Sequence, residues 1–76
     1  MINYKDYIIS DYKIMLGKPI IKGTRITVEL ILKKLSEGVS IPLLIEMYPQ
    51  LNTEQVHAAL EYASNVVGNE EVLELA

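Results

Sequence analysis

The sequence predicts a mainly α-helical protein in which three short helices follow a segment of short β-strands. Three stretches in the second part of the chain carry apolar residues at helical spacing, and each follows a good N-cap residue (Thr27, Ser40 and Asn52). The first part instead has isoleucine pairs between glycines, prolines and turn-forming residues, as short strands do. The length of 76 residues predicts one domain, with strands and a Gly/Pro loop over 1–27, a three-helix bundle over 28–67 and an acidic tail over 68–76.

Short extended pieces are expected before the helices. Tyr7–Ile9 and Tyr12–Met15 are predicted strands, separated by a turn at Ser10-Asp11. Ile20–Ile21 is expected to be extended because a proline and a glycine bracket it, and Arg25–Ile26 to be extended again. Such pieces are too short to form an independent sheet, so they need a helical layer to cover them or a second chain to pair with.

The first helix is expected over Val28–Glu37. The Thr27 hydroxyl can accept a hydrogen bond from an early helical N–H, and Glu29 suits the positive end of the helix dipole. Gly38 is the expected left-handed stop. Four residues share the face that we expect to be buried, namely Val28, Ile31, Leu32 and Leu35.

The second helix is expected over Ile41–Tyr48, capped by Ser40 and ended by Pro49. Its predicted core stripe is Leu44, Ile45 and Tyr48.

The third helix, expected over Thr53–Val67, has the clearest start. Asn52 and Gln55 have the spacing of a capping box, and Leu51 and Val56 that of a hydrophobic staple. Val56, Ala59, Leu60, Ala63 and Val67 follow helical spacing. The residues after Gly68 predict a short docking helix, an added strand or a frayed tail. Three short helices joined by tight turns match the three-helix form of the helix-turn-helix.

Composition limits the possible functions. Half of the residues are hydrophobic, more than a core of this size hides, which favours a two-fold homodimer over a monomer with ordinary exposed aliphatics. Without cysteine and with a single histidine, His57, no metal site or other cofactor is expected. The chain has no membrane-length apolar run and no signal peptide, so we expect a cytoplasmic protein that binds no membrane and no small-molecule substrate.

Two stretches resemble the signature of a known family. They are Gly-Lys-Pro-Ile-Ile-Lys-Gly-Thr-Arg-Ile-Thr-Val over residues 17–28, and Tyr-Pro-Gln-Leu over residues 48–51. Both resemble the DUF433 family, small prokaryotic proteins catalogued as a domain of unknown function, and the resemblance runs from about Tyr7 to about Ala63. It implies a homeodomain-like helix-turn-helix fold and an antitoxin role beside a PIN-like ribonuclease toxin.

Charge is distributed unevenly along the chain. Residues 1–38 hold all seven basic residues and four acidic ones, a net charge of +3. Residues 39–76 hold six glutamates and no Lys or Arg, a net charge of −6. This division indicates that the first half is the part able to face nucleic acid.

The candidate nucleic-acid contacts therefore lie in the first half. They are Lys13, Lys18, Lys22, Thr24 and Arg25, beside glycines that allow close backbone approach and tyrosines able to stack on bases. The alternative is that the lysines form a solvated face. For Arg25 alone a structural role is favoured, in which it binds carbonyls or a carboxylate such as Asp11.

The third helix carries polar residues but no cation. Glu54 and Glu61 would repel phosphates, so a protein interface is favoured over reading of DNA. The predicted partner-binding residues are on this helix and in the tail: Glu54, Ala58, Glu61, Tyr62, Glu70, Glu71, Leu73 and Leu75.

Enzymatic activity is not expected. The glycines at 17 and 23 lack the Gly-Lys-Ser/Thr of a phosphate-binding loop, and His57 has no Ser/Asp set around it. Three hypotheses remain open. The first is a dimeric antitoxin whose acidic half blocks a ribonuclease toxin and whose basic half contacts operator DNA. The second is a free-standing DNA-binding regulator, and the third a structural interaction module.

Overall fold

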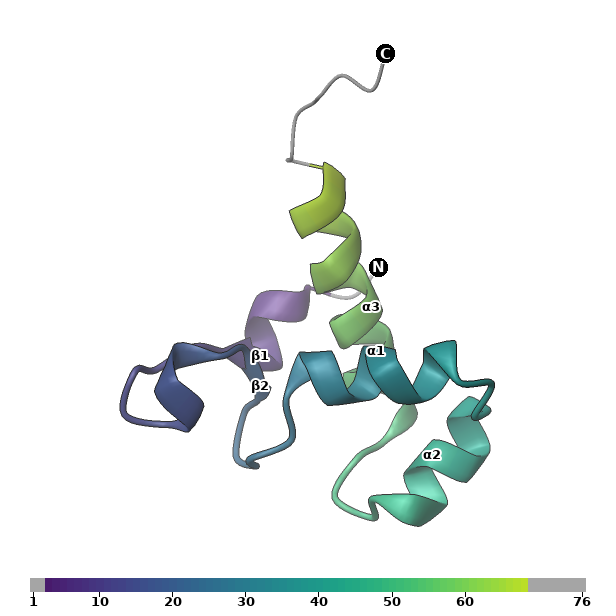
Figure 1. The fold of residues 1–76 in the computed structure, drawn as a ribbon. Coiled ribbons are helices and arrows are strands. Elements are labelled where there is room, and N and C mark those ends of the chain that lie inside the picture. Colours follow the sequence, from purple (N-terminus) through teal and green to yellow (C-terminus); the bar gives the residue numbers. More distant parts are fainter. Residues whose placement is uncertain (1–2, 69–76) are drawn as a thin grey trace.

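The computed structural model describes residues 3–68 (Figure 1). Over these residues the fold is mainly α-helical, as predicted, with three helices and one short antiparallel pair of strands. In chain order the elements are η1 (Tyr4–Asp6), β1 (Ile8–Ile9), η2 (Met15–Gly17), β2 (Ile20–Ile21), α1 (Val28–Ser36), α2 (Ile41–Met47) and α3 (Thr53–Gly68), where η marks a 3₁₀ turn. Each helix matches its predicted range to within one residue at either end, which is the usual uncertainty of helix ends.

The two strands form an antiparallel pair in which Ile8 lies opposite Ile21 and Ile9 opposite Ile20. The other edge of β2 pairs with the chain that leads into α1. There the Ile21 N–H donates to the Ile26 carbonyl at 2.9 Å, and the Val28 N–H donates to the Pro19 carbonyl at 3.0 Å. The extended segments predicted at Ile20–Ile21 and Arg25–Ile26 thus pair with one another and tie the start of α1 to the strands.

The prediction of a strand over Tyr12–Met15 is wrong. The Asp11 carboxylate accepts the Lys13 N–H at 2.9 Å and the Asp11 carbonyl accepts the Ile14 N–H at 2.7 Å, so the chain turns where a strand would have begun. Met15, Leu16 and Gly17 follow with φ of 53°, 57° and 84°. A left-handed conformation costs roughly 1–2 kcal/mol for each residue with a Cβ, so this turn is under strain at Met15 and Leu16.

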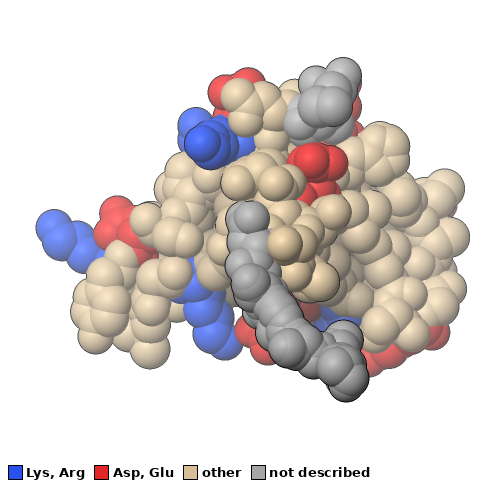
Figure 2. Space-filling view, turned by 90° about the horizontal axis from the view of Figure 1, so that it is seen from above, with Lys and Arg blue, Asp and Glu red and all other residues tan. Residues whose placement is uncertain are grey.

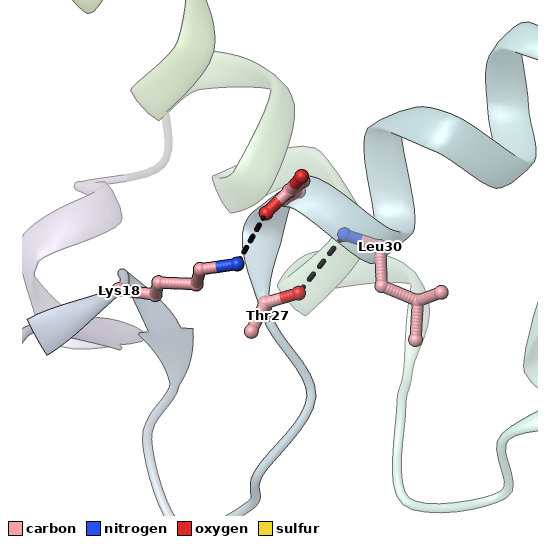
Figure 3. Close-up of polar contacts among 4 residues, drawn as sticks. Lys18, Thr27 and Leu30 are labelled. Carbon is pink, nitrogen blue, oxygen red and sulfur yellow. Dashed lines mark hydrogen bonds and ion pairs between the residues drawn. The ribbon is translucent and has the colours of Figure 1, made fainter. Parts of the chain in front are cut away.

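All three predicted N-caps are present. The Thr27 hydroxyl accepts the Leu30 N–H at 3.0 Å (Figure 3), and the Ser40 hydroxyl accepts the Leu43 N–H at 3.2 Å. At α3 the capping box is complete, because the side chains of Asn52 and Gln55 each accept the other's backbone N–H at 2.8 Å. Gly38, after α1, has the predicted left-handed φ, at 94°.

We expect Asn52→Ala to lower the free energy of unfolding by about 1 kcal/mol, because the first turn of α3 loses its cap. Urea denaturation followed by circular dichroism measures this change. The neighbouring Thr53→Ala removes a side chain for which no hydrogen bond is found among residues 3–68, and serves as the control. Equal losses in the two variants would contradict the stabilising role of the capping box.

The core lies where the three helices meet the strands. α1 packs against both α2 and α3, and η1 packs against α3. The fully or almost fully buried residues come from every part of the fold: Ile8, Ile20, Ile21, Val28, Ile31, Leu44, Leu51, Val56, Ala58 and Ala59. The predicted stripes of α1 and α2 are in or against this core.

On α3, helical spacing identified only part of the buried face. Val56 and Ala59 are buried as expected, but Leu60 is exposed and Val67 is 71% exposed. Ala58 is buried instead, on the side of α3 that faces the rest of the protein. A methyl group lets helix backbones approach one another closely, so the small residues and not the larger leucine occupy the packed face.

Candidate functional site

The loop between β2 and α1 has a defined shape. Gly23 adopts a φ of 85°, which glycine tolerates without strain, and the Thr24 N–H donates to the Ile21 carbonyl at 3.0 Å. The Thr24 hydroxyl donates to the same carbonyl at 2.8 Å and accepts the Ile26 N–H at 2.9 Å. The Gly-Thr pair thereby fixes the turn and holds Arg25 next to it.

The predicted nucleic-acid residues have different surroundings. Lys13 and Lys22 are exposed at successive turns of the N-terminal segment, and Arg25 is exposed beside the second of them. Thr24 is partly buried, and its only hydroxyl hydrogen is used within the loop, so Thr24 shapes the site and has no donor left for a phosphate. Lys18 is exposed, but its ammonium lies 3.1 Å from the Glu29 carboxylate at the start of α1 (Figure 3).

Within the described part of the chain, Arg25 lacks the contacts that its favoured structural role requires. Among residues 3–68, no hydrogen bond or ion pair of its guanidinium is found, and the Asp11 carboxylate accepts from the Lys13 backbone instead. Arg25 borders a groove of about 750 Å³ between the loop after β2 and the end of α2. Its guanidinium is therefore available to a ligand.

The walls of this groove are mainly apolar. Ile9 and Leu30 line it from the strand and helix sides, and Met47, which is 42% exposed, lines it from the end of α2. Tyr48 and Gln50 add polar groups, while Arg25 is the one charged residue among the lining. The groove can accordingly hold apolar side chains together with an anionic group.

The sequence analysis did not identify this groove, although part of each of its two sides lies within the motifs that it singled out. Arg25 belongs to the stretch 17–28, and Tyr48 and Gln50 belong to 48–51. These two stretches carry the family resemblance, and they lie about twenty residues apart in the sequence. The two stretches line one groove only in the folded chain, and neither the periodicity nor the charge of the sequence indicates that they come together.

The predicted partner face of α3 divides in two. Ala58 has no exposed surface, and Tyr62 packs edge-to-face on Tyr4, with ring centroids 5.5 Å apart. Ala58 is therefore removed from the predicted contact set, and the Tyr62 ring serves in part to hold η1 on α3. Glu54 is exposed and Glu61 partly exposed, as a partner surface requires.

The Glu61 carboxylate accepts a hydrogen bond from the Asn65 side chain at 3.1 Å. The other four predicted partner residues, Glu70, Glu71, Leu73 and Leu75, lie outside the described residues.

The two kinds of charge are less separated on the surface than along the chain. On the face drawn in Figure 2, most of the blue Lys and Arg atoms lie on the side of the strands, with red Asp and Glu atoms next to them. Lys18 pairs with Glu29, and Lys34 lies 3.9 Å from Glu37. Acidic residues of the first half therefore partly neutralise its lysines. The cations without such a pair among residues 3–68 are Lys5, Lys13, Lys22, Arg25 and Lys33.

Several kinds of site are missing from the part of the chain that the structure describes. Within residues 3–68, no group of three or more His, Cys, Asp or Glu side chains is placed to hold a metal ion. None of the helices described combines the length and the apolar character needed to cross a membrane. His57 lies exposed on α3.

Comparison with known proteins places the chain in a family. The model of the family described as "Protein of unknown function (DUF433)" matches residues 8–63, which is most of the chain. The protein therefore belongs to the DUF433 family, as its two motifs indicated. No curated protein and no solved structure matches the chain significantly.

Proposed function

We propose that this protein is a non-enzymatic antitoxin of a type II toxin–antitoxin pair, which binds and blocks a PIN-like ribonuclease in the cytoplasm. The main support is the surface of α3. This helix follows the turn of the helix-turn-helix, yet Thr53–Gly68 contains no Lys or Arg, while Glu54 and Glu61 are accessible. Binding of nucleic acid depends on cations that neutralise phosphates, so α3 suits a basic protein better than DNA. Opposite charges on two partners speed and select their association.

The N-terminal segment supplies a second contact in this proposal. Lys13, Lys22 and Arg25 are exposed, and in the proposed complex they bind phosphates of operator DNA while α3 holds the toxin. The antitoxin thereby represses its own operon. The proposed assembly is a homodimer, since large apolar side chains such as Leu16 and Leu43 are exposed on the single chain.

Co-expression with the protein encoded by the adjacent reading frame tests the proposal. We expect the two proteins to co-purify, and the complex to lack the RNA-cleaving activity that the partner shows alone. The absence of a nuclease gene beside this one, or a nuclease that does not bind, would refute the antitoxin function.

A free-standing DNA-binding regulator is the second candidate, favoured by exposed cations of the N-terminal segment such as Lys13, Lys22 and Arg25. It predicts that the protein alone shifts its own promoter DNA in a gel, and that binding weakens steeply with salt. Replacing Lys18, Lys22 and Arg25 with Ala should abolish the shift. Binding that survives this change moves the DNA site to α3, and binding of neither DNA nor a nuclease leaves the structural interaction module.

A further inference from the structure

The groove bordered by Arg25 has the chemistry of a peptide-binding site. Its walls are largely apolar, and its one charged group is a guanidinium with no ion pair among residues 3–68. Arginine binds a carboxylate through two parallel hydrogen bonds, which fixes the orientation of the ligand as well as its affinity. The matching ligand is an extended segment that combines apolar side chains with a carboxylate. Nucleic acid fits this groove poorly, because a single cation with apolar walls neutralises few phosphates.

We propose that the groove binds residues 71–75 of a second copy of this chain. Their sequence is Glu-Val-Leu-Glu-Leu, which combines two carboxylates with three apolar side chains. The carboxylate of Glu71 or Glu74 pairs with Arg25, and the neighbouring aliphatic side chains cover Met47 and Leu30. The carboxylates of Glu29, Glu37 and Glu61 already have partners in the described part of the chain and sit on helices, so they are less suited to enter a groove.

The positions of the groove and of Gly68 show why the segment comes from another copy. The groove is lined by Met47 and Gln50, which come just before α3, whereas residues 69–76 follow its opposite end (Figure 1). A helix of 16 residues is about 24 Å long. Leu73 comes five residues after Gly68, and five extended residues span at most about 18 Å. The whole segment of the same chain therefore cannot lie in its own groove, and only its last residues have the length to come near the start of α3.

An exchange of segments between two copies fills the grooves of both chains. Each chain offers one groove and one segment, so a two-fold dimer in which each segment enters the partner's groove is closed and leaves neither site empty. Neither a toxin nor DNA takes part in this exchange, so it does not depend on the proposed function. Arg25 cannot pair fully with a carboxylate and a phosphate at once, so a chain whose groove is occupied contacts operator DNA through Lys13 and Lys22. Residues 71–75 then have two possible partners, the groove of a second copy and the proposed toxin. Binding of a toxin to these residues would open the dimer.

Paramagnetic broadening between chains tests this exchange. The protein has no cysteine, so Ala76→Cys provides a single attachment point for a nitroxide label. The labelled full-length chain is mixed in several-fold excess with the full-length chain that carries ¹⁵N and no nitroxide, so that most ¹⁵N chains pair with a labelled one. We expect the amide signals of Gly23, Arg25, Met47 and Gln50 in the ¹⁵N chain to lose most of their intensity, and to recover it when the nitroxide is reduced.

Two variants of the ¹⁵N chain test the role of the arginine. Arg25→Gln should restore the groove signals, because the segment loses its ionic partner. Lys22→Gln removes the same charge from an exposed residue nearby that does not line the groove, and should leave the broadening unchanged. Broadening that persists in Arg25→Gln would refute the pairing with a carboxylate.

Other outcomes identify other occupants and overturn the proposal. No broadening at the groove, or broadening elsewhere, excludes the exchange. A further sample uses a chain that carries both ¹⁵N and the nitroxide, highly diluted with a chain that carries neither. Broadening that survives this dilution indicates binding within one chain. Groove signals that respond only to an added DNA duplex, or only to the adjacent gene's product, assign the groove to that partner.

Discussion

Leu44→Ala is expected to lower the free energy of unfolding by about 3 kcal/mol, as is usual for leucines in a well-packed core. Leu44 lies on α2 and has no exposed surface, and it belongs to the cluster that joins the helices to the strands. Truncation removes buried apolar contacts and leaves a cavity that the surrounding side chains fill only in part. Domains of this size are stable by roughly 4–11 kcal/mol, so the variant loses a large share of its stability. Urea denaturation followed by circular dichroism measures the loss.

The neighbouring residue provides a matched control. Leu43 is on the same helix but 47% exposed, and Leu43→Ala is expected to change stability by less than about 1 kcal/mol. A loss at Leu43 as large as that at Leu44 would contradict the packing described here. If the loss at Leu43 also grew with protein concentration, it would indicate that a second copy covers this side of α2.

The features predicted best from the sequence depend on neighbouring residues. Thr27, Ser40 and Asn52 each cap a helix because the hydroxyl or amide is within three residues of the N–H that it accepts. Such pairs are visible in a short window of sequence. At Tyr12–Met15 two local tendencies competed, and the side chain of Asp11, by accepting a backbone N–H, produced a turn in place of the strand that Tyr and Ile favour.

The features that were missed depend on contacts between distant parts of the chain. Helical spacing marked both Leu60 and Ala59, but the packing of η1, α1 and α2 on α3 decides which side is buried, and it selected Ala58 and Ala59. The groove arises in the same way, since Arg25 and Gln50 line it together although they lie far apart in the sequence. Charge was misleading for a related reason, because Lys18 and Glu29 meet only in the folded chain.

Reversing the charge of α3 should have the largest effect on the proposed function. With Glu54→Lys and Glu61→Lys combined, we expect the affinity for the ribonuclease to fall on the order of 100-fold, because two attractive contacts with a basic surface become repulsive. RNA cleavage by the ribonuclease should then persist at antitoxin concentrations that silence it with the unchanged protein. Titration calorimetry and a cleavage assay measure the two effects.

The double variant needs a control for charge and for stability. Glu46→Lys makes the same substitution at an exposed residue of α2, and should leave the affinity within a few-fold of the original. A lysine in place of Glu54 opposes the dipole in the first turn of α3 and costs about 0.3–1 kcal/mol, so circular dichroism must show that the variant is folded under the assay conditions. If inhibition were unchanged by the double variant but lost in Glu46→Lys, the partner surface would lie on α2 and the argument from the acidic face of α3 would be wrong.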